Sequence, residues 1–276
     1  MEARRCAVLG RPIAHSLSPA LHRAGYREVG LDWSYEAYDV GSAELPAFLA
    51  GLDATWRGLS LTMPLKRAVL PLLDDLDERA RQAGAANTLL LQDERRSGVN
   101  TDVPGAAAAI SERHSGPVAR ALVLGGGATA ASVLLALADL GCRQARLVVR
   151  DPTRVADTLA AVARHPEPPR VEVQALEEAR PEPGWDIVVS TVPAAAQTVA
   201  IVGFAAAAPV VFDVGYDPWP TPLAARAAAD DRTLVSGLDL LVHQAAEQFR
   251  LMTGRPAPLA AMRAAGERAL AERQAT

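Results

Sequence analysis

The sequence predicts an α/β protein of two domains, the second of them a nucleotide-binding unit inserted into the first. Short runs of aliphatic residues alternate with longer, alanine-rich helical segments, which is the pattern of parallel α/β sheets. One such run, Ala121–Leu124, is followed at once by three glycines, Gly125-Gly126-Gly127. With 276 residues, the chain is long enough for each of two domains to bury a core of its own.

The first domain begins with a predicted strand over 6–9. Ser18 and Pro19 are suited to be the N-cap and first-turn proline of a helix that ends near Gly30. The remaining elements of this domain follow from the same alternation. They are strands over 33–38, 58–62, 88–91 and 96–100, a helix over 43–49, and helical segments that run through Gln82 and end at Gly84.

In the second domain, the strand over 121–124 leads through the glycines into a helix to about Leu140. Further strands are predicted over 146–149, 171–174, 186–190 and 210–214, with a helix over 152–163 between the first two. From Gly237 the chain is helical, broken at 254–256, and these helices carry no glycine motif of their own. We therefore assign 1–102 plus 238–276 to the first domain and 103–237 to the second, with the boundary near Val103-Pro104-Gly105.

Composition excludes several classes of protein. The net charge of −4 argues against nucleic acid or an anionic membrane as a partner. The N-terminal apolar run is too short for a signal peptide, and Gly203 and Pro209 interrupt the longest apolar stretch. The two cysteines and five histidines show no metal-site spacing, so we assign no metal. We expect a soluble, cytoplasmic enzyme that is a monomer or homodimer.

Lys66 is the first candidate catalyst because it is the only lysine among 28 basic residues. An amine can lose its proton in a suitable environment, whereas a guanidinium effectively never does. Lys66 also follows the strand over 58–62 and Pro64, so it lies at a strand-to-helix junction, where α/β proteins place their chemistry.

Polar side chains gather at the predicted strand ends of the first domain. They are Ser16 and Ser18, then Ser60 and Thr62 with Lys66, then Asn87-Thr88, and finally Asn100-Thr101-Asp102. The carboxyl ends of parallel strands share one edge of a sheet, so these groups are expected to converge. Each also has a structural interpretation as a helix cap or turn residue. Together, hydroxyls, amides, one amine and one carboxylate suit a small, polyhydroxylated, anionic ligand.

The motif Gly125-x-Gly127-x-x-Ala130 follows a strand and begins a helix, which is the context of a Rossmann dinucleotide fingerprint. Glycines let the backbone approach a pyrophosphate, whose charge is stabilised at the helix N-terminus. The next strand ends Val149-Arg150-Asp151, with Arg154 one turn later. Two guanidiniums favour a 2′-phosphate and hence NADP, whereas Asp151 facing the ribose would favour NAD.

Several motifs together resemble the shikimate dehydrogenase family in order and spacing from about residue 6 to 252. They are Ser16-Leu17-Ser18-Pro19, Leu61-Thr62-Met63-Pro64-Leu65-Lys66, Ala86-Asn87-Thr88, Asn100-Thr101-Asp102, the glycine turn, Thr191-Val192-Pro193, Asp213-Val214-Gly215-Tyr216 and the segment from Gly237 to Ala245. The resemblance implies reversible, NADP-dependent reduction of 3-dehydroshikimate to shikimate, a step of aromatic amino-acid biosynthesis, with hydride transfer at the nicotinamide.

The resemblance also implies roles for individual residues. Lys66 and Asp102 would be the catalytic pair. The substrate would be bound by Ser16, Ser18, Ser60, Thr62, Asn87, Tyr216 and Gln244. The cofactor would be bound by Gly125, Gly126, Gly127, Ala128, Thr129, Ala130, Arg150, Arg154, Thr191, Val214 and Gly237.

The chain departs from the family pattern at three places. Ser60 stands where the family often has asparagine, which shortens the reach toward a substrate. Val149-Arg150-Asp151 replaces the frequent Asn-Arg-Thr, and Ala131 replaces an arginine common after the glycine turn. Two alternatives therefore stay open: an NAD-preferring quinate/shikimate dehydrogenase and a non-catalytic nucleotide-binding paralogue. Intact Lys66, Asp102 and Gln244 argue against the paralogue.

Overall fold

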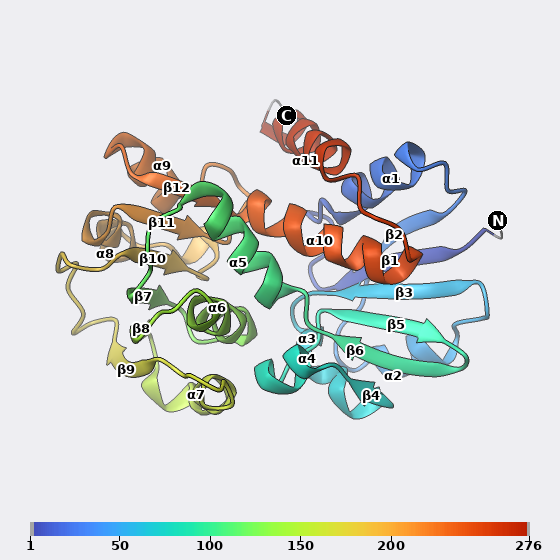
Figure 1. Ribbon diagram of the computed structural model, residues 1–276, viewed down its shortest axis with the longest axis horizontal. Coiled ribbons are helices and arrows are strands. Elements are labelled where there is room, and N and C mark those ends of the chain that lie inside the picture. The colour runs from blue at the N-terminus through green and yellow to red at the C-terminus, as the bar shows by residue number, and fades with distance from the viewer. Residues whose placement is uncertain (1–2, 275–276) are drawn as a thin grey trace. The chain divides into compact units, whose positions relative to one another are not determined.

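The computed structural model describes residues 3–274 and confirms the mixed α/β class (Figure 1). The chain divides into two compact units. The first contains the residues up to Thr101 and those from Leu241 onward, and the second is Asp102–Leu240. Each unit is built around one six-stranded sheet.

The sheet of the first unit has the strand order β2-β1-β3-β5-β6-β4. Its strands are β1 (Arg5–Gly10), β2 (Ser34–Asp39), β3 (Trp56–Leu61), β4 (Asp75–Leu76), β5 (Thr88–Gln92) and β6 (Arg95–Val99). β1 pairs in parallel with β2 and β3, as the sequence predicts. β5 is antiparallel to both β3 and β6, which the prediction of a parallel sheet did not anticipate. The two residues Asp93 and Glu94 at positive φ make a tight hairpin between β5 and β6, and so tight a connection joins only antiparallel strands.

The helices of the first unit are α1 (Ser18–Glu28), α2 (Leu45–Ala50), α3 (Leu65–Ala68), the 3₁₀ turn η1 (Leu70–Leu72), α4 (Glu78–Ala83) and α11 (Leu259–Gln274). α10 (Gly237–Thr253) contributes its residues from Leu241 on. α1 and α11 pack side by side (Figure 1). The N-cap of α1 is Leu17, without a side-chain hydrogen bond, so the prediction of Ser18 as the cap was wrong.

The core of the first unit joins the aliphatic residues of the central strands, among them Leu9, Leu59 and Leu89, all fully buried. On α1 the buried face is aromatic. The His22 ring stacks on Tyr35 with centroids 4.1 Å apart, and Tyr26 packs 5.5 Å from Phe249 of α10. These contacts fix α1 and α10 against the sheet.

The second sheet is parallel throughout, in the order β12-β11-β10-β7-β8-β9. Its strands are β7 (Arg120–Leu124), β8 (Gln144–Val149), β9 (Arg170–Ala175), β10 (Ile187–Ser190), β11 (Val210–Asp213) and β12 (Thr233–Ser236). The order reverses at β7, whose neighbours are β8 and β10. In open α/β sheets such a switch point places a binding crevice at the carboxyl ends of the strands.

The helices of the second unit are α5 (Asp102–Arg113), α6 (Ala128–Asp139), α7 (Ala156–Ala163), α8 (Val199–Gly203) and α9 (Pro222–Ala229), with 3₁₀ turns η2 (Pro152–Arg154), η3 (Ala194–Ala196) and η4 (Phe204–Ala207). α6 packs against α5 and α7, and α8 packs against α9. Val103-Pro104-Gly105 lies in the first turn of α5, where a proline loses no helical hydrogen bond. One sequence prediction needs correction. The helix predicted over 152–163 is divided at Val155 into the 3₁₀ turn η2 and the helix α7. The Val155 side chain is buried at this break.

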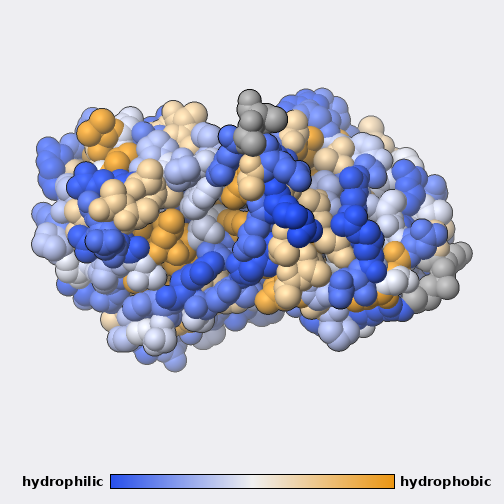
Figure 2. All heavy atoms as spheres, turned by 90° about the horizontal axis from the view of Figure 1, so that it is seen from above, coloured by the Kyte–Doolittle hydropathy of each residue, from blue (hydrophilic) through white to orange (hydrophobic). Residues whose placement is uncertain are grey.

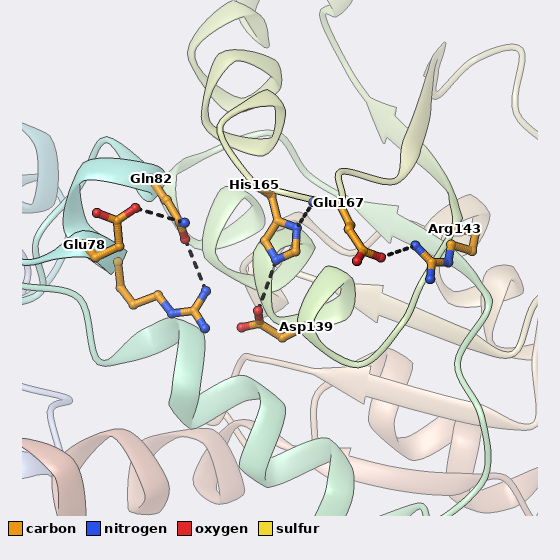
Figure 3. A network of polar contacts seen from close by, with 7 residues as sticks. Glu78, Gln82, Asp139, Arg143, His165 and Glu167 are labelled. Atoms are coloured by element: carbon orange, nitrogen blue, oxygen red, sulfur yellow. Dashed lines mark hydrogen bonds and ion pairs between the residues drawn. The ribbon is translucent and has the colours of Figure 1, made fainter.

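His165 connects the end of α6 to the segment before β9 (Figure 3). Its Nδ1 accepts a hydrogen bond from the Glu167 amide at 3.0 Å, so Nε2 has the proton and donates to Asp139 at 3.1 Å. Glu167 in turn pairs with Arg143. In the first unit, Gln82 donates to Glu78 within α4 at 3.2 Å (Figure 3).

The surface mixes hydrophilic and hydrophobic residues over short distances on the face drawn in Figure 2. Within residues 3–274, no helix combines the length and the apolar character needed to cross a bilayer.

Candidate functional site

The polar clusters of the first unit converge because β5 runs backwards. Ser60 near the end of β3 pairs with Thr88 at the start of β5, and Thr88 pairs with Val99 at the end of β6. Asn87 therefore lies at the beginning of an antiparallel strand, where the sequence analysis had placed it at the end of a parallel one. Both arrangements bring it to the same edge of the sheet, because reversing a strand exchanges its ends.

Lys66 lies in the first turn of α3, immediately after that edge. The amide of Leu65 donates to the carbonyl of Thr62 at 2.7 Å, which turns the chain from β3 into the helix. The amide of Ala86 donates to the carbonyl of Lys66 at 2.8 Å. The backbone of the candidate catalyst is thus bound to the residue preceding Asn87.

Asn87 is the centre of a buried amide network with Thr101 and Gln244, none of them more than 8% exposed. Its Nδ2 donates to Thr101 Oγ1 at 2.9 Å and to Gln244 Oε1 at 3.2 Å. Its Oδ1 accepts from the Thr101 amide at 2.8 Å. The structure thus brings together two residues that the sequence assigns to the substrate, although 157 positions separate them.

Ser60 belongs to the same buried region, and its hydroxyl has two partners. It accepts from the Tyr35 hydroxyl at 2.5 Å and donates to Gln248 Oε1 at 2.7 Å. Neither Tyr35 nor Gln248 was predicted from the sequence. Gln248 follows Gln244 by four residues, one helical turn, so the helical period offered a signal for it.

Ser16 and Ser18 lie in and just after the loop between β1 and α1. The Ser16 amide donates to the carbonyl of Ile13 at 2.9 Å, and the Ser18 amide donates to Ser16 Oγ at 3.3 Å. These bonds hold the two serines in one turn. Thr62 is bound to the neighbouring strand, because its amide donates to the Leu9 carbonyl at 2.9 Å.

In the second unit the glycine turn lies at the carboxyl edge of β7. Gly125 has φ +103°, and a Cβ there would collide with Thr191 Oγ1. The Thr191 hydroxyl donates to the Leu124 carbonyl at 3.1 Å. Gly127 is the N-cap of α6, so the turn leads directly into a helix N-terminus. A Cβ at Gly127 would meet nothing within 4 Å, and this open space at a helix N-terminus fits a site for a pyrophosphate.

Arg150 and Arg154 flank the corner after β8. Asp151 between them caps η2, since its Oδ1 accepts from the Thr153 amide at 3.0 Å and from the Thr153 hydroxyl at 2.6 Å. These hydrogen bonds lower the pKa of Asp151 below its usual range. One oxygen of the carboxylate that could have favoured a ribose hydroxyl is therefore held by its own turn.

A cavity of about 500 Å³ lies beside Arg150. Its walls come from the segment after β9 and from α8, namely Leu176, Glu177, Ala179, Arg180, Pro181, Val199, Ala200 and Gly203. Most of these residues are apolar, and the guanidiniums of Arg150 and Arg180 also line the cavity. Such a cavity suits a flat ring attached to an anionic group.

The end of β11 is organised by Asp213, which is fully buried. Its carboxylate accepts from the Thr221 hydroxyl at 2.6 Å, from Gln197 at 2.8 Å and from the Gly215 amide at 3.2 Å. Burial raises the pKa of Asp213, and these hydrogen bonds act in the opposite direction. A Cβ at Gly237 would meet the Val214 carbonyl, so only glycine permits this approach of the two segments.

Of the other predicted site residues, Ala128, Thr129 and Ala130 form the first turn of α6, and Tyr216 follows Gly215 after β11. Lys66 belongs to the first unit, and Asp102 is the first residue of the second. Among residues 3–274, no group of three or more His, Cys, Asp or Glu side chains is placed to hold a metal ion.

Comparisons with known proteins give a consistent result. Residues 8–89 match the family model described as the shikimate dehydrogenase substrate binding domain. Residues 237–265 match the model described as the shikimate 5′-dehydrogenase C-terminal domain. The chain is 37% identical to the shikimate dehydrogenase (NADP⁺) of Moorella thermoacetica over 266 residues, covering 93% of this chain and 90% of that protein.

Two solved structures agree. The crystal structure of Mycobacterium tuberculosis shikimate dehydrogenase has a TM-score of 0.87 at 39% identity, over 96% of this chain and 99% of that one. The Thermus thermophilus shikimate 5-dehydrogenase in complex with NADP(H) and shikimate has a TM-score of 0.79 at 32% identity, over 97% of this chain and 100% of that one.

Proposed function

The chain belongs to the shikimate dehydrogenase family, and from this premise we propose that it catalyses the reversible, NADP-dependent reduction of 3-dehydroshikimate to shikimate. The proposal rests above all on one observation, the similarity to an NADP-dependent shikimate dehydrogenase along 93% of the chain. The enzyme would act in the cytoplasm, as a monomer or homodimer, in the pathway that makes aromatic amino acids.

The first unit would bind the substrate. Its hydroxyls and amides are the donors and acceptors that a polyhydroxylated carboxylate requires. We assign Ser16, Ser18, Thr62, Asn87 and Gln244 to this task, with Tyr216 from the second unit. The Ser60 hydroxyl is engaged by Tyr35 and Gln248, so we assign Ser60 to the support of these residues.

The glycine turn and the corner after β8 would hold NADP. The open space at Gly127 and the N-terminus of α6 fit the pyrophosphate. Arg150 and Arg154 fit the 2′-phosphate, because guanidiniums form strong, charge-assisted hydrogen bonds with phosphates, and one oxygen of Asp151 is held by Thr153. The cavity beside Arg150 fits the adenine ring. Thr191, Val214 and Gly237 border the same carboxyl edge of the sheet. When bound, the reduced cofactor supplies the hydride.

Lys66 and Asp102 would handle the proton. As the ketone is reduced, negative charge develops on its oxygen, and the Lys66 ammonium would stabilise that charge and give a proton to the oxygen. In the reverse direction the amine takes the proton from the hydroxyl of shikimate. The Asp102 carboxylate would attract the ammonium and so orient it. An ionised partner also favours the charged form of an amine.

A spectrophotometric assay of NADPH formation from shikimate and NADP tests the proposal. We expect turnover with this pair, and lower kcat/KM with NAD or with quinate. Higher kcat/KM with NAD and quinate would identify the quinate/shikimate alternative. Cofactor binding without turnover of either alcohol would identify the non-catalytic paralogue.

A further inference from the structure

Gln248 lies 1% exposed in the first unit, with the hydrogen-bonding groups of its side chain amide paired. Its Nε2 donates to the Asn87 carbonyl at 3.2 Å and to Thr88 Oγ1 at 2.9 Å. A backbone carbonyl can only accept, so the amide nitrogen must face Asn87. Oε1 then faces Ser60, which donates to it. The orientation of the Gln248 amide is therefore determined.

The direction of the Thr88 hydroxyl is determined in the same way. The Thr88 hydroxyl accepts from Gln248, so its single proton is directed to Asn87 Oδ1 at 3.0 Å. The Thr101 amide donates to the same oxygen at 2.8 Å. The Thr101 hydroxyl also lies within hydrogen-bond distance of this oxygen, at 3.2 Å. Because donors surround Oδ1, the amide nitrogen of Asn87 turns away from Thr88 and toward Gln244. The donors thus run in one direction from Tyr35 through Ser60, Gln248 and Thr88 to Asn87.

We propose, resting on the proposed function, that Gln248 is a positioning residue which acts through Thr88 and Asn87 to orient the Gln244 amide for the substrate. The two N–H groups of Asn87 donate to Thr101 and Gln244, so Gln244 Oε1 is occupied and its Nε2, which also donates to the Leu241 carbonyl, meets an oxygen acceptor of the polyhydroxylated ligand as a donor. Well-packed apolar residues can replace a buried polar group at little cost in stability. A fully paired polar network in the core fixes one orientation instead.

The main test is Thr88→Val, which removes the hydroxyl at nearly constant volume. Asn87 Oδ1 loses the Thr88 donor, and Gln248 loses its link to that oxygen. We expect the KM for shikimate to rise by about tenfold, the scale of one lost hydrogen bond, with kcat and the KM for NADP within about twofold. Thr88→Ser keeps the hydroxyl and should return the KM to within about twofold of wild type.

Tyr35→Phe is the matched control. It also removes one buried hydroxyl from the same network, but at the far end, and Ser60 still donates to Gln248. We expect its KM for shikimate to stay within about twofold of wild type. A rise equal to that of Thr88→Val would mean that any loss of polarity in this core weakens binding, and would overturn the proposal.

Gln248→Met tests the residue itself, since methionine has a similar length and no amide. It should raise the KM for shikimate in the same direction, and the double variant with Thr88→Val should raise it no further, because both act along one path. KM effects that multiply, or an unchanged KM in Thr88→Val, would overturn the proposal while leaving the proposed function standing. Absence of shikimate oxidation by the wild type would overturn the proposed function first.

Discussion

The guanidinium of Arg113 donates to the carboxylate of Asp239 at 2.7 Å, although 126 positions separate the two residues. Arg113 ends α5, and Asp239 lies in the first turn of α10 with only 2% of its side chain exposed. Asp239 also accepts from the amide and hydroxyl of Ser236. The pair therefore joins the C-terminal end of α5 to the first turn of α10.

Loss of this pair should destabilise the protein. Arg113→Met removes a charged partner from the buried Asp239 carboxylate. Since Arg113 is itself 44% exposed, we expect a loss of about 1–3 kcal/mol in the free energy of unfolding, measured by urea denaturation. Arg226→Met, which breaks the more exposed Arg226–Asp230 pair, should cost under about 0.5 kcal/mol. Equal losses in the two variants would contradict this expectation.

Arg273 should affect substrate binding from the last turn of α11. Its guanidinium donates to the carbonyls of His15 at 2.5 Å and Ser16 at 3.3 Å, and so holds the loop before α1. We expect Arg273→Gln to raise the KM for shikimate by about threefold to tenfold with an unchanged KM for NADP. Arg268→Gln removes an exposed arginine from the same helix and should change neither constant.

Lys66 should be indispensable for turnover. Arginine at this position keeps the positive charge but cannot exchange a proton. We expect Lys66→Arg to lower kcat by about 10²-fold or more while NADP binding, followed by fluorescence titration, is nearly unchanged. Arg67→Lys, at the next position, serves as the control and should keep normal turnover. A Lys66→Arg variant with near-normal kcat would refute the proton-transfer role.

Arg150 and Arg154 should determine the cofactor preference. Each guanidinium is expected to bind the 2′-phosphate that NAD lacks. Arg150→Gln or Arg154→Gln should raise the KM for NADP by about tenfold to 100-fold and leave the KM for NAD within about twofold. Arg170→Gln, at the start of β9 and so at the opposite edge of the sheet, should change neither. Parallel losses with both cofactors would show that these arginines do not discriminate.

His22 should make the protein sensitive to acid. Burial lowers the pKa of His22 from 6.5 to about 3, while a contact with Gln248 acts in the opposite direction. The unfolded chain therefore binds a proton below pH 6.5 that the folded protein does not. The stability that His22 contributes above pH 6.5 is lost as the pH falls from 6.5 to about 3.

The comparison with His22→Phe isolates this effect, because phenylalanine can stack on Tyr35 and does not titrate. The wild type should lose up to about 1.4 kcal/mol more than the variant per pH unit within that window. Urea denaturation at a series of pH values measures the difference. Stability curves that stay parallel below pH 6 would mean that His22 is protonated in the folded state.

Much of the fold was predictable because its central strands can be recognised from short stretches of sequence. The strands β1, β3, β7 and β8 are aliphatic runs between polar turns, and their position follows from residues close in sequence. β4 and β12 were missed because they have two and four residues and are strands only through their neighbours. α8 and α9 were missed because alanine obscures the helical period there.

The candidate site was predictable at the level of residue types and motifs, while its assignments remain predictions. Sequence pointed to Lys66 by its uniqueness and to Gly125 by its place between a strand and a helix. Tyr35 and Gln248 were not visible in this way, because a tyrosine in a strand and a glutamine in a helix are ordinary residues. Their place in the buried network depends on hydrogen bonds that join four separate elements.

Periodicity and residue chemistry are local properties, so the α/β class, the glycine turn at the end of β7 and the polar groups available for chemistry can be read from the residues alone. The antiparallel direction of β5 and the orientation of the Asn87 amide nitrogen toward Gln244 arise from contacts made in the folded protein. Each hydrogen atom of a buried amide is directed to an acceptor, so the orientation of that amide depends on partners far away along the chain.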